Sequence, residues 1–156
     1  MSAADIARMH VPADGGERLS FMGMDLVWKI TKEMSRGAYV VFEQIAPPGT
    51  GVPLHIHHAE EENIFLIEGG LAFQLGEEKF EVHPGDVVNM PRGTPHGFRA
   101  TGEQPTRVLF TLDLSPTSDY ETMFAGLVGL APQDFAEIKR VCAANNVEFI
   151  EPPTLP

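Results

Sequence analysis

Short runs of apolar, β-branched and aromatic residues, separated by polar turns, occupy the chain from residue 21 to residue 114. Glycine or proline stands at nearly every junction between them, which is typical of strands joined by tight turns. We predict strands at 24–30, 38–45, 55–57, 62–67, 71–75, 79–82, 87–90, 96–100 and 106–114. Such closely spaced strands favour an antiparallel barrel or sandwich over an alternating α/β arrangement.

Beyond residue 115 the apolar positions follow the period of an α-helix. Ser118 or Asp119 can cap a first helix, and Pro132 stands near the first turn of a second. The predicted apolar stripes are Met123, Phe124, Leu127 and Val128 in the first helix and Phe135, Ile138, Val141 and Cys142 in the second. Amphipathic helices must bury such stripes, so the mouth of the barrel is one candidate surface, where they would form a lid. Pro152 and Pro153 should end the regular structure.

The length predicts one domain over 1–156, made of an arm at 1–20, a β-barrel at 21–114 and a helical extension at 115–156. The polar arm should lie on the body or across a partner subunit. The chain has 11 Lys and Arg against 22 Asp and Glu, a formal charge of −11, which argues against nucleic acid and anionic membranes as partners. The single Cys142 excludes an internal disulfide and should be a packed residue. No apolar run has the length of a signal peptide or membrane helix, so we expect a cytoplasmic protein.

Three histidines and one glutamate form the candidate site. In a strand, His55 and His57 point to the same face. Glu62 begins the next strand and should sit beside the histidine pair across the sheet. His96 follows a stiff segment with proline at both ends. Three imidazoles and a carboxylate suit one divalent transition metal ion, Fe, Mn, Ni, Co, Cu or Zn, rather than Ca or Mg. The alternative is that the histidines are packed or surface residues and that 60–62 is a solvated acidic turn.

The spacing of these residues resembles that of the cupin family. The first cupin motif, G-x5-H-x-H-x4-E-x6-G, is matched by Gly49, His55, His57, Glu62 and Gly69. The second, G-x5-P-x-G-x2-H-x3-N, is matched by Gly85, Pro91, Gly93 and His96, with Ala100 in place of the final asparagine. The resemblance implies an antiparallel jelly-roll β-barrel followed by two short helices. It also implies that His55, His57, Glu62 and His96 bind a metal inside the barrel, and that the chain forms a homodimer.

Single-domain cupins similar to this chain most often resemble quercetinase-type dioxygenases. That resemblance implies a small-molecule enzyme that adds O2 to an enol or phenol, such as a flavonol, with Glu62 as the catalytic general base. Two alternatives stay open. The metal could serve as a Lewis acid for an isomerase, cyclase, lyase or decarboxylase, or the barrel could bind a small ligand without catalysis.

Overall fold

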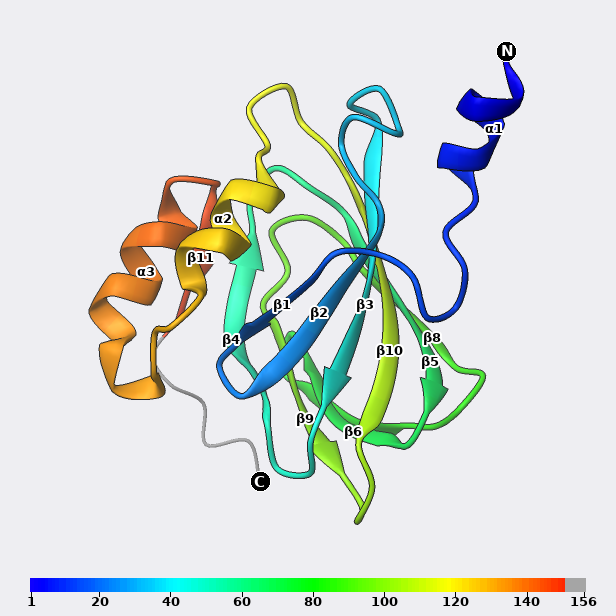
Figure 1. Ribbon diagram of the computed structural model, residues 1–156. Helices are drawn as coiled ribbons and strands as arrows, with labels where there is room; N and C mark the ends of the chain where they lie inside the picture. The colour runs from blue at the N-terminus through cyan, green and yellow to red at the C-terminus, as the bar shows by residue number, and fades with distance from the viewer. Residues whose placement is uncertain (151–156) are drawn as a thin grey trace.

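Two antiparallel β-sheets face each other across a shared apolar core in the computed structural model, which describes residues 1–150 (Figure 1). The first sheet has the order β1 (Arg18–Phe21), β2 (Met24–Ile30), β3 (Tyr39–Ala46), β10 (Thr106–Asp113), β5 (Glu62–Glu68), β8 (Val87–Met90). The second has the order β11 (Val147–Phe149), β4 (Gly51–His57), β9 (His96–Thr101), β6 (Gly70–Leu75), β7 (Glu78–Val82). Within residues 1–150 no strand pair joins the two sheets, so the jelly roll is not closed into a continuous hydrogen-bonded barrel.

Alternation along the central strands builds the core. On β10, Val108, Phe110 and Leu112 are buried, and the residues between them are partly exposed. Phe110 is the register partner of Phe42 on β3, and their rings stack with centroids 5.0 Å apart. Burying a side chain of this size stabilises the fold by about 1.5–3 kcal/mol. The predicted β-rich body is therefore confirmed, with the inward face of each sheet supplying the core.

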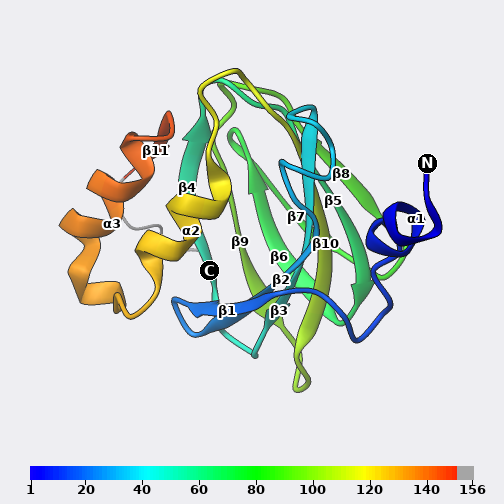
Figure 2. The ribbon, with the colours of Figure 1, turned by 45° about the horizontal axis from the view of Figure 1, so that its top comes forward.

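Two helices cover one end of the sandwich, beside β4 and β11 (Figure 2). Asp119 caps helix α2 (Tyr120–Leu127), and its side chain accepts a hydrogen bond from the Thr122 N–H. A 3-10 turn (Pro132–Asp134) leads into α3 (Phe135–Ala143). Both helices were predicted. Of their predicted apolar stripes, Met123, Phe124, Leu127, Ile138 and Cys142 are buried, Phe135 and Val141 are partly buried, and Val128, just after the end of α2, is 51% exposed. None of the helices in residues 1–150 has the length and apolar character needed to cross a membrane.

Cys142 of α3 is 1% exposed, and burial raises the pKa of its thiol to about 12. A thiol with so high a pKa carries almost no thiolate near neutral pH. The interpretation of Cys142 as a packed residue is confirmed.

The predicted arm contains a helix and the start of a strand. Helix α1 (Ala3–Met9) is capped by reciprocal hydrogen bonds between Ser2 and Asp5. In both ribbon views it lies on the opposite side of the molecule from α2 and α3 (Figures 1 and 2). Lys29 Nζ donates to the carbonyl oxygens of Pro12, Ala13 and Gly15, at 3.3, 3.0 and 2.7 Å. These contacts tie the end of the arm to the chain's own sheet.

One sequence-based expectation changes, and one strand is added. β4 pairs with β9 and β11, whereas β5 pairs with β10 and β8, so the prediction that Glu62 lies beside the histidines in one sheet is wrong. The chain crosses from one sheet to the other between His57 and Glu62. Strand β11 was not predicted: Val147, Glu148 and Phe149 alternate between buried and exposed as in a strand, but three positions are too few to identify one from the sequence. The predicted end at Pro152 and Pro153 lies outside the described residues.

Candidate metal centre

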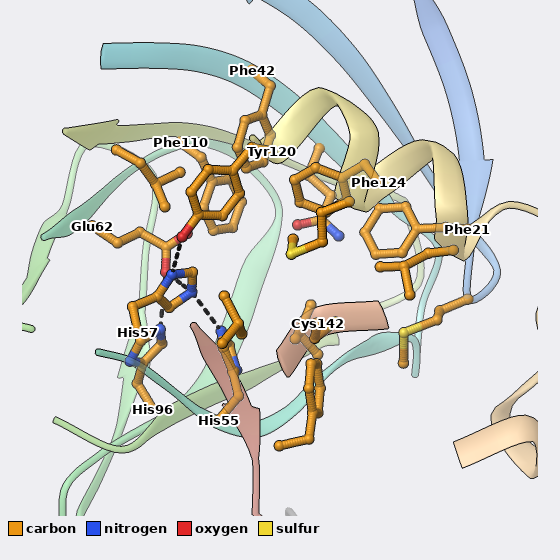
Figure 3. A pocket seen from close by; sticks show the side chains of 18 of the residues that line it. Phe21, Phe42, His55, His57, Glu62, His96, Phe110, Tyr120, Phe124 and Cys142 are labelled. Carbon is orange, nitrogen blue, oxygen red and sulfur yellow. Dashed lines mark hydrogen bonds and ion pairs between the residues drawn. The ribbon is translucent and has the colours of Figure 1, made fainter. Parts of the chain in front are cut away.

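Four buried side chains converge inside the sandwich, and one possible ligand atom from each lies within 4.8 Å of the others (Figure 3). His55 and His57 extend from β4, and His96 begins β9, where it is the register partner of His55. Glu62 reaches the same point from β5 in the opposite sheet. The alternation of β4 places both of its histidines on the inner face, as predicted. The structure thus brings together all four residues that the sequence analysis identified as candidate metal ligands.

Local backbone geometry fixes the orientation of two of the imidazoles. His55 Nδ1 lies 2.8 Å from the carbonyl oxygen of Pro53, and His96 Nδ1 lies 2.9 Å from that of Thr94. A carbonyl oxygen only accepts, so Nδ1 carries the proton in both rings. The stiff segment before His96 is held in turn by the Gly93 N–H, which donates to the His57 carbonyl oxygen at 2.8 Å. Each Nε2 is therefore left with a lone pair for another partner.

The third imidazole is oriented by a residue distant in sequence. His57 Nδ1 lies 2.6 Å from the Tyr120 hydroxyl, which donates its own proton to Glu60 Oε2 at 2.9 Å. Since the phenol has one proton and gives it to Glu60, it accepts from His57. Burial, followed by the negative charge of Glu60, raises the pKa of Tyr120 and keeps this phenol protonated. All three histidines therefore present an unprotonated Nε2 to the centre.

Spacings at the centre match those of ligands around one ion. The Nε2 atoms of His55 and His57 are 3.1 Å apart, and Glu62 Oε2 lies 2.9 Å from His96 Nε2 and 3.5 Å from His57 Nε2. Two ligand atoms at right angles, each ~2.1 Å from an ion, are about 3 Å apart. Three neutral nitrogens and one carboxylate oxygen are also the donor chemistry of a divalent transition metal. The residues present therefore fit such an ion.

The charge states of these side chains also favour metal binding. Burial lowers the pKa of His55 well below its ordinary value of 6.5, and the neighbouring His96 and His57 lower it further. Burial also lowers the pKa of His57, against the opposing charge of Glu62. For Glu62, burial alone would raise the pKa, but the neighbouring His57 and His96 together hold it below its ordinary value. Neutral imidazoles beside an ionised carboxylate are the ligand forms that metals require.

The sequence analysis missed two residues of this centre, Glu60 and Tyr120. Glu60 is fully buried and accepts hydrogen bonds from Ser118 and Tyr120, so it is wrong to treat all of 60–62 as a solvated turn. Glu61 does face the surface, where it pairs with Arg92. Nothing in the local pattern separates Glu60 from Glu61, because the partners of Glu60 come from a segment 58 and 60 positions further along the chain.

A cavity of about 50 Å³ opens beside the four residues, between the sheets and the two C-terminal helices. Its walls are mainly aromatic and aliphatic, and the polar side chains other than the four candidate ligands are Gln44 and Tyr120. Gln44 is 2% exposed, and its side-chain nitrogen lies 3.1 Å from the Met24 sulfur. Phe98 lines the cavity, and Ile64 and Leu66 are buried in the core. The four candidate ligands therefore form a polar site at the wall of a mainly apolar cavity.

The other histidines stand away from this centre. The side chain of His83 is 67% exposed in a turn, and His10 is exposed on the arm. His58 pairs with Glu148 at the surface, with 2.7 Å between His58 Nε2 and the carboxylate. Exposed histidines of this kind provide natural controls for the buried three.

Comparison with known proteins agrees with the fold and with the motif spacing. A family model described as a cupin domain matches residues 32–112, just over half of the chain, and the chain therefore belongs to the cupin family. It is 39% identical over 67 residues to an uncharacterized protein of Methanocaldococcus jannaschii, covering 43% of this chain and 54% of that protein. It is 34% identical over 64 residues to quercetin 2,3-dioxygenase of Bacillus subtilis, covering 41% of this chain and 19% of that enzyme. The chain thus spans about half or less of the length of these relatives.

Among solved structures, the polyketide cyclase RemF of Streptomyces resistomycificus superimposes with a TM-score of 0.59 and 25% sequence identity. The match covers 68% of this chain and 79% of that one. Proteins similar to this chain thus have names that indicate different reactions, so the family assignment defines the scaffold rather than the reaction.

Proposed function

We propose that this protein is a metal-dependent enzyme acting on a small, largely apolar organic molecule, and that its reaction is the dioxygenation of an enol or phenol. The observation that carries the proposal is the convergence of His55, His57, His96 and Glu62 within 4.8 Å at the wall of an apolar cavity. A structural zinc site normally closes its sphere with protein ligands and often uses cysteine, whereas this one faces a cavity and contains none. Similarity to a quercetin 2,3-dioxygenase supports the oxidative version.

The chain's own groups have distinct roles in this proposal. When bound, a redox-active divalent ion would supply Lewis acidity towards a substrate oxygen and electron exchange with O2. Glu62 would accept the proton of the substrate hydroxyl, because its carboxylate is ionised and lies at the cavity wall. The aromatic walls would hold the carbon skeleton and exclude water. His55, His57 and His96 would remain neutral ligands throughout.

Cavity size adds a condition. A cavity of about 50 Å³ is smaller than the 150 Å³ space that admits benzene in a well-studied engineered protein. A flavonol-sized molecule could bind only after α2 or α3 moves away from the sheets. The lid hypothesis drawn from the helical pattern therefore becomes part of the proposed function.

Metal content and oxygen uptake test the proposal together. The wild-type protein, His57→Ala and the exposed-site control His83→Ala are purified, depleted of metal, and loaded anaerobically with Fe, Mn, Ni or Co. Oxygen uptake is then followed with flavonols and other enolisable phenols. We expect near-stoichiometric metal and metal-dependent uptake in wild type and His83→Ala, and neither in His57→Ala. Wild-type protein that binds no metal would rule out the proposed centre.

A non-oxidative reaction is the second candidate, favoured by the structural similarity to a polyketide cyclase. The same site would polarise a carbonyl for cyclisation, isomerisation, decarboxylation or a lyase reaction. Product that forms at constant oxygen concentration would select this candidate. Metal binding without turnover of any enolisable substrate would leave small-ligand binding as the function.

We also propose a single domain over 1–156, a cytoplasmic location and a homodimer. One continuous core cluster, which draws on both sheets and both C-terminal helices, supports the single domain. A lone, buried cysteine is compatible with a reducing compartment. Light scattering coupled to size exclusion checks the dimer, and a monomer would contradict it.

A further inference from the structure

Tyr120 joins the candidate metal centre to the helix that covers it. It is the first residue of α2 and is 1% exposed, and its hydroxyl lies 2.6 Å from His57 Nδ1 and 2.9 Å from Glu60 Oε2. Figure 3 shows the phenol oxygen directed at the His57 ring, between the helix and the candidate ligands. The ring also packs against that of His57, with centroids 5.8 Å apart. One α2 side chain thus contacts a candidate ligand through both its ring and its hydroxyl.

The other two histidines have no such link to a helix. His55 and His96 donate from Nδ1 to the carbonyl oxygens of residues two positions earlier, Pro53 and Thr94, in their own segments. Pro53 lies in β4 and Thr94 in the segment before β9, so neither partner belongs to a helix. Among the three histidines, His57 alone has its Nδ1 partner on a helix that could move as a unit. Its orientation and tautomer therefore depend on where α2 lies.

The acceptor that orients the phenol lies between the site and the start of α2. Glu60 is in the connection from His57 to Glu62, and its second oxygen accepts from the hydroxyl of Ser118, just before the helix. Ser118 in turn lies 2.7 Å from Ser115, oxygen to oxygen. One carboxylate oxygen of Glu60 thus bonds to Ser118, just before α2, and the other to Tyr120, its first residue, so Glu60 holds the start of the helix beside the site and sets the direction of the Tyr120 proton.

Helix α2 is also a wall of the cavity. Met123, Phe124 and Leu127 line it together with Tyr120, so moving this helix is one way of enlarging a space of about 50 Å³. A movement of α2 as a unit would take the Tyr120 hydroxyl away from His57. Opening of the cavity and loosening of a candidate ligand are then the same event.

We propose that Tyr120 is a positioning residue that couples closure of α2 to metal binding at His57. Withdrawal of electron density from His57 Nε2 on metal binding makes its Nδ1–H a stronger donor, which strengthens the bond to Tyr120 and holds α2 closed. By linkage, closure of α2 strengthens metal binding by the same factor. The inference rests on the proposed metal site and adds a mechanical role for one hydroxyl group.

The test uses Co²⁺ alone as the probe and compares wild type with Tyr120→Phe. This substitution keeps the buried ring and removes the hydroxyl. Tyr39→Phe is the matched control, because it removes the hydroxyl of the other tyrosine, which is 43% exposed on β3. Cobalt affinity is measured by competition with a chelator, the cobalt absorption spectrum records the ligand field, and amide hydrogen exchange of α2 is followed with and without cobalt. Thermal unfolding of the metal-free forms checks that each variant is folded.

We expect Tyr120→Phe to bind cobalt about 10–100-fold more weakly, the usual effect of removing a hydrogen-bond partner of a ligating histidine. Its cobalt spectrum should shift, and cobalt should no longer slow exchange in α2 as it does in wild type and Tyr39→Phe. A second variant, Glu60→Gln, removes the charge that orients the phenol and should weaken cobalt binding in the same direction. Wild-type affinity and wild-type α2 protection in Tyr120→Phe would overturn the coupling alone. Absence of cobalt binding in wild type would overturn the metal site and the coupling with it.

Discussion

His55 and His57 bring their Nε2 atoms to 3.1 Å from each other, although neither atom has a proton to donate. Both rings already give their single Nδ1 proton, to the Pro53 carbonyl and to Tyr120 respectively. Two facing lone pairs repel each other unless a cation lies beside them. Burial and neighbouring histidines disfavour a proton there, since both lower the pKa of His55. The pair is thus arranged for a metal ion rather than for protonation.

Acidification should destabilise the metal-free protein, starting near pH 6.5. The folded-state pKa values of His55 and His57 are lowered from 6.5, so below that pH the unfolded chain takes up protons that the folded chain does not. The free energy of unfolding should then fall with decreasing pH, by up to about 1.4 kcal/mol per pH unit for each histidine. Glu62 adds a loss in the same direction below its ordinary value of 4.5.

Urea unfolding from pH 7.5 to 5, with a chelator present, measures this dependence. His55→Gln should have a shallower slope than wild type, whereas His83→Gln, which changes an exposed residue, should keep the wild-type slope. Equal slopes in wild type and His55→Gln would contradict the prediction.

Glu62→Gln should separate metal binding from turnover. The glutamine amide keeps the shape of the side chain and an oxygen that can bind the metal, but it cannot accept a proton from the substrate. We therefore expect partial metal retention and a fall in turnover of about 10²–10⁴-fold. Metal content by mass spectrometry and oxygen uptake with the best phenolic substrate give the two values. Glu61→Gln is the matched control, since Glu61 pairs with Arg92 at the surface and should leave both values unchanged. Full turnover in Glu62→Gln would exclude the base role.

Phe124→Ala should show how firmly α2 is attached. The Phe124 ring lies within 5.1–5.8 Å, centroid to centroid, of the rings of Phe21, Trp28 and Phe42. Its removal should lower the free energy of unfolding by about 3 kcal/mol, as for other buried phenylalanines. Val128→Ala, at an exposed position just after the helix, should change it by no more than about 0.5 kcal/mol. Urea unfolding compares them, and similar losses for both variants would show that α2 is not anchored through Phe124.

Gly69 should tolerate alanine much less well than Gly76. Both have positive φ, +89° and +60°, which disfavours any residue with a Cβ. A Cβ at Gly69 would also lie 2.5 Å from the hydroxyl of the buried Thr106, whereas at Gly76 it would meet open space. We expect losses of about 3 kcal/mol for Gly69→Ala and about 1 kcal/mol for Gly76→Ala in urea unfolding. Equal losses would mean that Thr106 moves aside.

The four candidate ligands were predictable because their spacing reflects local geometry. The two-residue period of β4 orients His55 and His57, and the segment 91–95 fixes His96. The route to Glu62 was not predictable, because an acidic turn followed by an apolar run describes a hairpin and a crossing between sheets equally well. The confirmed helices followed from their apolar period and from the Asp119 cap.

Residues whose roles depend on distant partners could not be found in this way. Tyr120 is one aromatic residue at the start of a predicted helix, and its contact with His57 spans 63 positions. Glu60 is likewise indistinguishable in sequence from the exposed Glu61 beside it. Only tertiary packing makes one of them a buried acceptor and the other a surface ion-pair partner.

Because the chain crosses from one sheet to the other between β4 and β5, the candidate metal centre has ligands from both sheets. His55, His57 and His96 belong to one sheet and Glu62 to the other, so an ion bound by all four would link the two sheets at a single point. Binding of this ion would oppose relative movement of the two sheets. It would also raise the free energy of unfolding, by an amount that grows with the affinity of the folded protein for the ion. The separation of the two sheets at the cavity would then depend on the radius of the bound ion. Exchanging one metal for another would therefore change the space available to a substrate.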